Sequence, residues 1–88
     1  MALSRQQLET TYQDIEVQLY NFALRWVFSP TLAEEIVHEA FIRVWHRRDE
    51  VMVETLRGLL YTTTKNLALN EIRRRRRHEA LPFLGWLE

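Results

Sequence analysis

The side chains best suited to chemistry in this chain are five consecutive arginines, Arg73 to Arg77, which follow a polar helical pattern. Guanidinium groups bind phosphates, so this block predicts a surface that lies against a nucleic-acid backbone. Amide and hydroxyl side chains at Thr62 and Asn66 precede it and are able to reach bases. The arginines have a second interpretation, in which they only complement the negative end of the helix dipole. One or two arginines would serve that purpose, so the sequence favours phosphate binding.

The charge of the chain is divided between its two halves. The formal net charge is zero, but residues 1–55 carry five arginines against nine acidic residues, and residues 56–88 carry seven basic residues against three acidic ones. The first part is therefore net −4 and the second net +4. A dipolar chain of this kind is suited to bind nucleic acid with one half and a basic protein with the other.

Two patterns suggest metal chemistry, but neither supplies a complete site. Glu35 and His38 have the Glu-x-x-His spacing of di-metal helical bundles, but the predicted inner faces supply no further glutamates. His38 and His46 lie two helical turns apart, about 12 Å, which is too far for one ion. No nucleophile–base pair and no Gly-rich phosphate loop is visible. We therefore expect no catalytic residue, no metal, no cofactor and no enzymatic activity.

Helices must position the polar and basic side chains, because the apolar residues recur at helical spacing throughout. The sequence predicts an all-α fold, a compact bundle of three helices over residues 5–28, 31–48 and 55–78, with a long basic third helix. Ser4 with Gln7, and Thr31 with Glu34, have the spacing of capping boxes. The predicted buried positions are Leu8, Tyr12, Ile15, Leu19, Phe22 and Trp26 in the first helix, Ala33, Ile36, Val37, Ala40 and Val44 in the second, and Leu56, Leu60, Thr64 and Leu67 in the third.

The second helix has a mixed outer face. Opposite its buried stripe, acids and imidazoles surround two large apolar side chains, Ile42 and Trp45. An apolar centre ringed by charges is typical of a protein-contact surface. Equally, a single exposed isoleucine is ordinary, and Trp45 is able to pack against a neighbouring helix.

The chain resembles a known family in three stretches taken in order. These are Leu32 to Trp45, Leu56 to Tyr61 and Asn66 to Arg74, and they strongly resemble region 2 of the bacterial sigma factors of the extracytoplasmic-function (ECF) group. The resemblance implies a domain over residues 1–80 that binds RNA polymerase core and recognises and melts the −10 promoter element. Residues 81–88 would be an apolar tail or the start of an interdomain linker.

The resemblance also implies two sets of contacts. The clamp helices of the polymerase β′ subunit would be met by Glu35, His38, Glu39, Ile42 and Trp45. The non-template strand of the −10 element would be met by the Asp49–Thr55 loop and by Arg57, Tyr61, Lys65, Asn66, Arg73, Arg74 and Arg76. An anti-sigma factor is a further candidate partner. The chain departs from the family at His38, where glutamine is usual, at Leu59, where tryptophan is common, and at Asn70, where aspartate is frequent.

Two other functions remain open. One is a small protein–protein module that binds polymerase or a regulator without touching DNA. The other is peripheral membrane attachment, with the arginines on anionic headgroups and Phe83, Leu84 and Trp86 inserted. The chain has no cysteine, no apolar run of membrane-spanning length and no signal-peptide pattern. We therefore expect a cytoplasmic protein without stable membrane insertion.

Overall fold

Three helices make up almost all of the structure, a computed structural model that describes the backbone of residues 2–87 and the side chains of residues 2–77. Helix α1 spans Arg5–Val27, α2 spans Pro30–His46 and α3 spans Leu56–Leu87. Two short 3₁₀ turns, η1 (Arg48–Glu50) and η2 (Val53–Thr55), join α2 to α3. The described residues contain no strand, so the predicted all-α bundle is confirmed.

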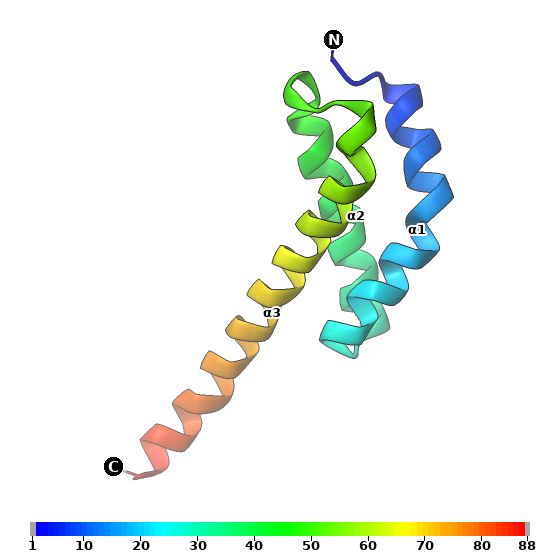
Figure 1. The fold of residues 1–88 in the computed structure, drawn as a ribbon. Helices are drawn as coiled ribbons and strands as arrows, with labels where there is room; N and C mark the ends of the chain where they lie inside the picture. Colours follow the sequence, from blue (N-terminus) through cyan, green and yellow to red (C-terminus); the bar gives the residue numbers. More distant parts are fainter. Residues whose placement is uncertain (1, 88) are drawn as a thin grey trace.

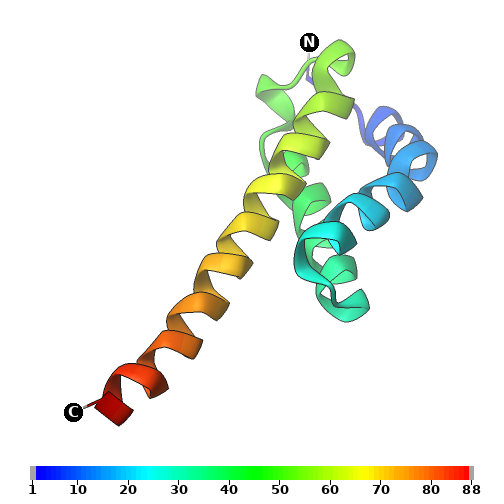
Figure 2. The same ribbon diagram turned by 60° about the horizontal axis from the view of Figure 1, so that its bottom comes forward.

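Each helix packs against both of the others, and α3 is the longest of the three. Its first half lies along α1 and α2, and its second half runs on past the turn between them (Figures 1 and 2). The molecule is therefore elongated, with extents of 57 × 23 × 15 Å. The basic segment lies where α3 leaves the other two helices.

Side-chain caps fix the beginnings of α1 and α2. The capping box predicted for Ser4 and Gln7 is present, with both reciprocal hydrogen bonds at the start of α1. The box predicted at Thr31 is wrong. Ser29 is the N-cap of α2, where its Oγ accepts a hydrogen bond from the backbone N–H of Leu32, and Pro30 is the first helical residue. The first helical position favours proline, because a backbone N–H at this position would have no carbonyl partner within the helix.

The ends of the helices also differ from the sequence expectation. Helix α1 stops at Val27, because Phe28 adopts the left-handed conformation with φ 54°. Helix α2 stops at His46, two residues early, and η1 begins at Arg48. Helix α3 does not end near residue 78 but continues through Pro82. A proline removes one intrahelical hydrogen bond, and the leucine and alanine before it favour the helix. The side chains of the 81–88 tail, including those invoked for membrane insertion, lie outside the described ones.

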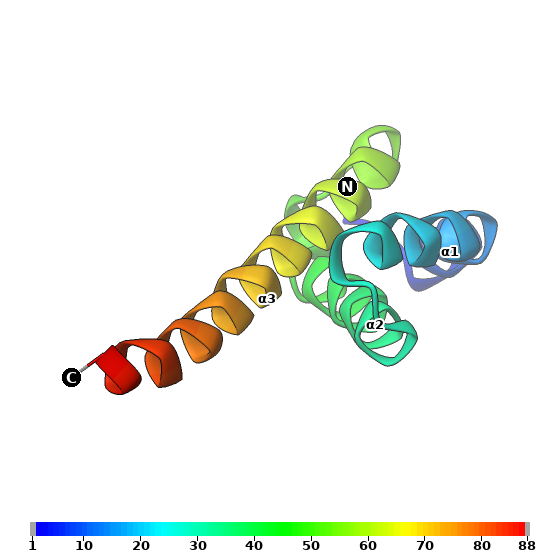
Figure 3. The ribbon, with the colours of Figure 1, turned by 90° about the horizontal axis from the view of Figure 1, so that it is seen from below.

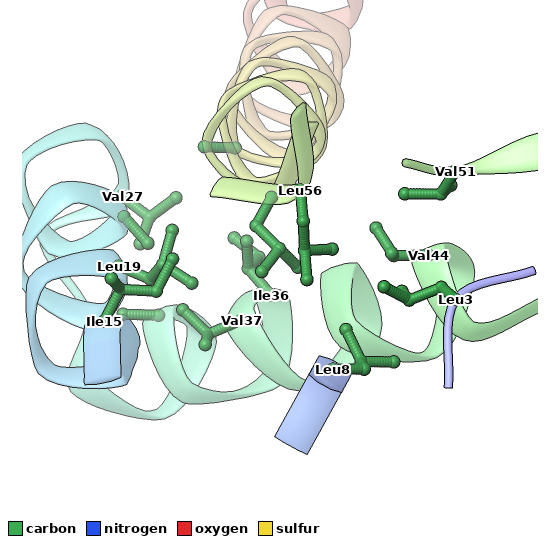
Figure 4. Packing of buried hydrophobic residues seen from close by; sticks show 14 residues of the cluster. Leu3, Leu8, Ile15, Leu19, Val27, Ile36, Val37, Val44, Val51 and Leu56 are labelled. Atoms are coloured by element: carbon green, nitrogen blue, oxygen red, sulfur yellow. The ribbon is translucent and has the colours of Figure 1, made fainter. Parts of the chain in front are cut away.

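The core lies where the three helices face one another, closed at one end by Leu3 and Val51 (Figure 4). All five positions predicted for α2 are buried, and so are Leu56, Leu60 and Thr64 of α3. Leu67 is only partly buried, and the small side chain of Ala68 takes the inner position next to it.

The predicted stripe of α1 is half correct. Leu8, Ile15 and Leu19 are buried, whereas Tyr12, Phe22 and Trp26 are partly exposed at the margins of the core. Because α1 packs against two helices, its buried arc is wide, and Ala23 and Val27 occupy inner positions that the four-and-three spacing did not select. Trp26 therefore packs on the edge of the core, not within it.

Candidate nucleic-acid and protein interfaces

The outer face of α3 is polar, basic and free of packing from the other helices. Thr62, Lys65, Asn66, Arg73 and Arg76 are all exposed, as the sequence predicts, and Leu69 is partly exposed. A Cβ added at Gly58 would meet no atom within 4 Å beyond its chain neighbours and the backbone of its own helix, so α3 is open at this point of the face as well. A phosphate backbone is able to approach this face along the described part of the helix.

The five arginines divide into two groups. Arg74 is held by Glu71 through two hydrogen bonds of 2.6 and 3.1 Å, which raise the pKa of the Arg74 guanidinium. Arg75 Nε lies 3.6 Å from Glu71 Oε1, and Arg75 Nη1 donates a 2.7 Å hydrogen bond to the backbone oxygen of Val27. Among the described side chains, Arg73, Arg76 and Arg77 form no ion pair. They are the arginines that remain available to a ligand.

The dipole interpretation of the arginines does not hold for α3 itself. Charges stabilise a helix dipole within its last turn, and α3 continues past the arginines to Leu87. Arg75 does act on a helix terminus, but it is the terminus of α1, because Val27 is the last residue of that helix. The sequence gives no signal for this contact, which joins residues far apart in the chain.

Two predicted DNA contacts, Arg57 and Tyr61, lie on the side of α3 that faces α1. Arg57 forms an ion pair with Asp14, and both side chains remain more than half exposed. The Tyr61 ring meets the Phe22 ring edge to face, with 5.3 Å between centroids. The seven predicted DNA residues therefore do not share one face, and Arg74, beside Glu71, lies on yet another side.

A groove of about 540 Å³ separates α2 from α3. It brings Glu39 and Ile42, predicted polymerase contacts, together with Asn66, a predicted DNA contact. Its walls carry Arg43, paired with Glu39 at 3.1 Å. The remaining lining residues are Val44, His46, Arg47, Leu59, Thr63, Leu67 and Asn70. The two sets of predicted contacts thus meet in one depression.

The side chains of the predicted outer face of α2 do not all remain on one surface, because its two apolar side chains pack toward different helices. Glu35, His38 and Glu39 are exposed, but Ile42 turns into the groove beside α3. Trp45 packs on the core from the α1 side. The Arg48 guanidinium lies 4.2 Å from the Trp45 ring centroid and donates to the Trp45 carbonyl oxygen at 3.1 Å. Trp45 therefore packs against its neighbours, and part of its side chain remains exposed.

The loop between α2 and α3 is more ordered and less polar than the sequence suggests. The Leu3 N–H bonds the Arg48 carbonyl at 3.0 Å, and Val51 is buried beneath. Met52 and Val53, in contrast, are 59% and 43% exposed. The N-terminal segment thus holds the loop so that it presents two apolar side chains next to the start of α3.

These surfaces lie within a segment that matches a known protein family. The family described as Sigma-70 region 2 matches residues 11–78, which is most of the chain. The chain belongs to the sigma-70 region 2 family. The match includes the loop and every predicted contact residue. No curated protein and no solved structure matched the chain.

Region 2 domains of sigma-70 factors bind RNA polymerase and recognise the −10 promoter element. Among the described side chains, histidines and acidic residues form no group of three that could hold a metal ion. Likewise, no described helix combines the length and apolarity needed to cross a membrane.

Proposed function

We propose that this sigma-70 region 2 domain is of the ECF type, that it docks on the β′ clamp helices, and that it captures the non-template strand of a melted −10 element. The observation that carries the proposal is the outer face of α3, where Lys65, Arg73 and Arg76 are exposed and form no ion pair with a described side chain. No described acidic side chain pairs with these cations, and a phosphate backbone accounts for their arrangement.

The DNA side combines this basic track with groups that suit unstacked bases. Thr62 and Asn66 supply a hydroxyl and an amide on or beside the outer face. The exposed Met52 and Val53 offer apolar surface at the head of the same helix. Arg57 joins them once its ion pair with Asp14 opens, which costs little because exposed pairs contribute about 0–1 kcal/mol.

The polymerase side consists of the exposed acids of α2 and the groove beside them. Glu35, His38 and Glu39 are accessible to basic side chains of a partner, and Ile42 gives the groove an apolar wall. Trp45 would contribute only the edge that its packing leaves exposed. Since Asn66 lines the same groove, bound polymerase and bound DNA would lie close together on this domain.

Salt titration of binding to a single-stranded −10 oligonucleotide tests the DNA side. The logarithm of affinity should fall with the logarithm of salt concentration, at a slope of about −0.7 per neutralised phosphate. Arg73→Gln with Arg76→Gln should make the slope shallower by about 1.4. Glutamine keeps the helix, and Arg5→Gln with Arg25→Gln removes the same charge from α1 as a control. An unchanged slope in the α3 variant would exclude this face as the DNA track.

Pull-down with polymerase core tests the other side. Glu35→Lys should abolish core binding, since like charges in contact cost several kcal/mol, and should leave DNA affinity intact. Normal core binding by this variant would disprove the assignment of α2. Core binding with no DNA binding at all would identify the chain as the protein–protein module instead, and binding to anionic liposomes would support membrane attachment.

A further inference from the structure

A second groove, between α1 and α2, belongs to neither of these surfaces. It encloses about 260 Å³, and its lining comes from α1 and α2 alone: Tyr12, Glu16, Val17, Tyr20, Glu34 and Val37. Figure 3 shows these two helices side by side, with α3 crossing the pair. None of the six residues is among the polymerase or DNA contacts proposed above.

The walls of this groove are aromatic and apolar. Val17 is 63% exposed and gives the groove an accessible apolar surface. Tyr12 and Tyr20 pack on the core, and Tyr12 meets Phe41 edge to face with 4.8 Å between ring centroids. The rings are therefore held in place before any ligand arrives, so that binding would cost little conformational entropy.

The charge of the groove is negative and uncompensated. Glu16 stands on α1 and Glu34 on α2, and neither forms an ion pair with a described side chain, unlike Glu9, Glu39 and Glu50. No lysine or arginine lines the groove. Burial raises the pKa of the Tyr12 hydroxyl, and Glu16 and then Glu34 raise it further, which shows that both carboxylates act on one place.

We propose that this groove binds an arginine or lysine side chain carried by a basic, partly apolar segment of a partner protein. The cationic head would lie over the tyrosine rings and between the two carboxylates, as cations favour both. Its aliphatic stem would cover Val17 and Val37. Nucleic acid and anionic membranes are disfavoured, because the groove repels their charge. The domain thus has an acidic protein-docking site that is separate from its polymerase surface.

Titration of the full chain with a designed helical peptide of leucine and arginine tests the site. The probe is compared with a twin in which citrulline, uncharged and nearly the same shape, replaces arginine. Amide chemical shifts should change around Tyr12, Val17 and Tyr20, and the citrulline twin should bind about tenfold more weakly. Equal binding of the two peptides, or shifts centred on Glu35 and Glu39, would overturn the proposal.

A second experiment compares a variant that lacks the two groove carboxylates with a control variant that loses the same charge elsewhere. Glu16→Gln with Glu34→Gln should weaken the arginine peptide about tenfold, while Asp49→Asn with Glu54→Gln, which removes equal charge from exposed loop residues, should change affinity less than twofold. Equal losses in the two variants would mean non-specific attraction and would overturn the proposal. Sedimentation of the chain without peptide tests the remaining candidate occupant of the groove, a second copy of the chain. Self-association that disappears in the groove variant would assign the groove to a second copy of the chain and would overturn the proposal of a different partner.

Discussion

Arg75 of α3 donates a 2.7 Å hydrogen bond from Nη1 to the backbone carbonyl of Val27, the last residue of α1. The final carbonyls of a helix lack intrahelical partners and carry the negative end of its dipole. A cation at this point satisfies one carbonyl and joins the basic segment to the body of the domain.

Arg75 and Arg76 should therefore separate stability from DNA binding. Arg75→Gln should lower the free energy of unfolding by about 1–2 kcal/mol, because a hydrogen bond from a charged donor is lost. Arg76→Gln should change it by less than about 0.5 kcal/mol but weaken DNA binding. Urea denaturation and salt titration of both variants measure the two effects. Equal stability of the variants would show that the Val27 contact contributes nothing.

Thr64 should be replaceable by valine with a gain in stability. It is fully buried, and its Oγ1 has no hydrogen-bond partner among the described residues, so folding removes the hydroxyl from water without compensation. Thr64→Val keeps the shape and should raise the free energy of unfolding by about 1 kcal/mol. Thr64→Ser keeps the hydroxyl, loses the methyl and should destabilise. Loss of stability in the valine variant would mean that the hydroxyl is satisfied after all.

Phe28 should be a second place where substitution stabilises the fold. It is 85% exposed and has φ 54°, a conformation that glycine adopts without strain. Phe28→Gly should raise the free energy of unfolding by about 1 kcal/mol, since strain is relieved and little packing is lost. Phe28→Ala retains the strain and serves as the control. A glycine variant no more stable than the alanine variant would contradict the argument.

Tyr12 should make stability depend on alkaline pH. Burial, Glu16 and Glu34 raise the pKa of its hydroxyl, so the folded chain holds this proton more tightly than the unfolded chain does. The resulting stability is complete below the unfolded pKa of about 10 and is lost as pH rises through the raised folded pKa. Denaturation at alkaline pH should thus show a steeper loss in the parent than in Tyr12→Phe. Tyrosinate absorbance should show the pKa falling in Glu16→Gln, and an unmoved titration there would exclude that carboxylate as a cause.

The sequence by itself determined the helices, the buried stripe of α2 and the exposure of the basic track on α3. These features follow from periodicity and local chemistry, since neighbours in a helix share a face at fixed spacing. The same local reasoning located the capping box at Ser4 but chose Thr31 over Ser29 for α2, because several residues nearby suit an N-cap and the turn geometry selects among them.

Only the tertiary structure decided which of the candidate side chains are free. Arg57 pairs with Asp14 and Arg75 with the end of α1, contacts between residues more than forty positions apart that no spacing rule reveals. Trp45 and Ile42, neighbours on a predicted face, turn toward different helices because α2 packs against both α1 and α3. The acidic groove between α1 and α2 likewise exists only in the fold, because Glu16 and Glu34 converge there from separate helices. The local sequence pattern determines on which face of its helix a residue lies, and tertiary packing determines which other residues that face contacts.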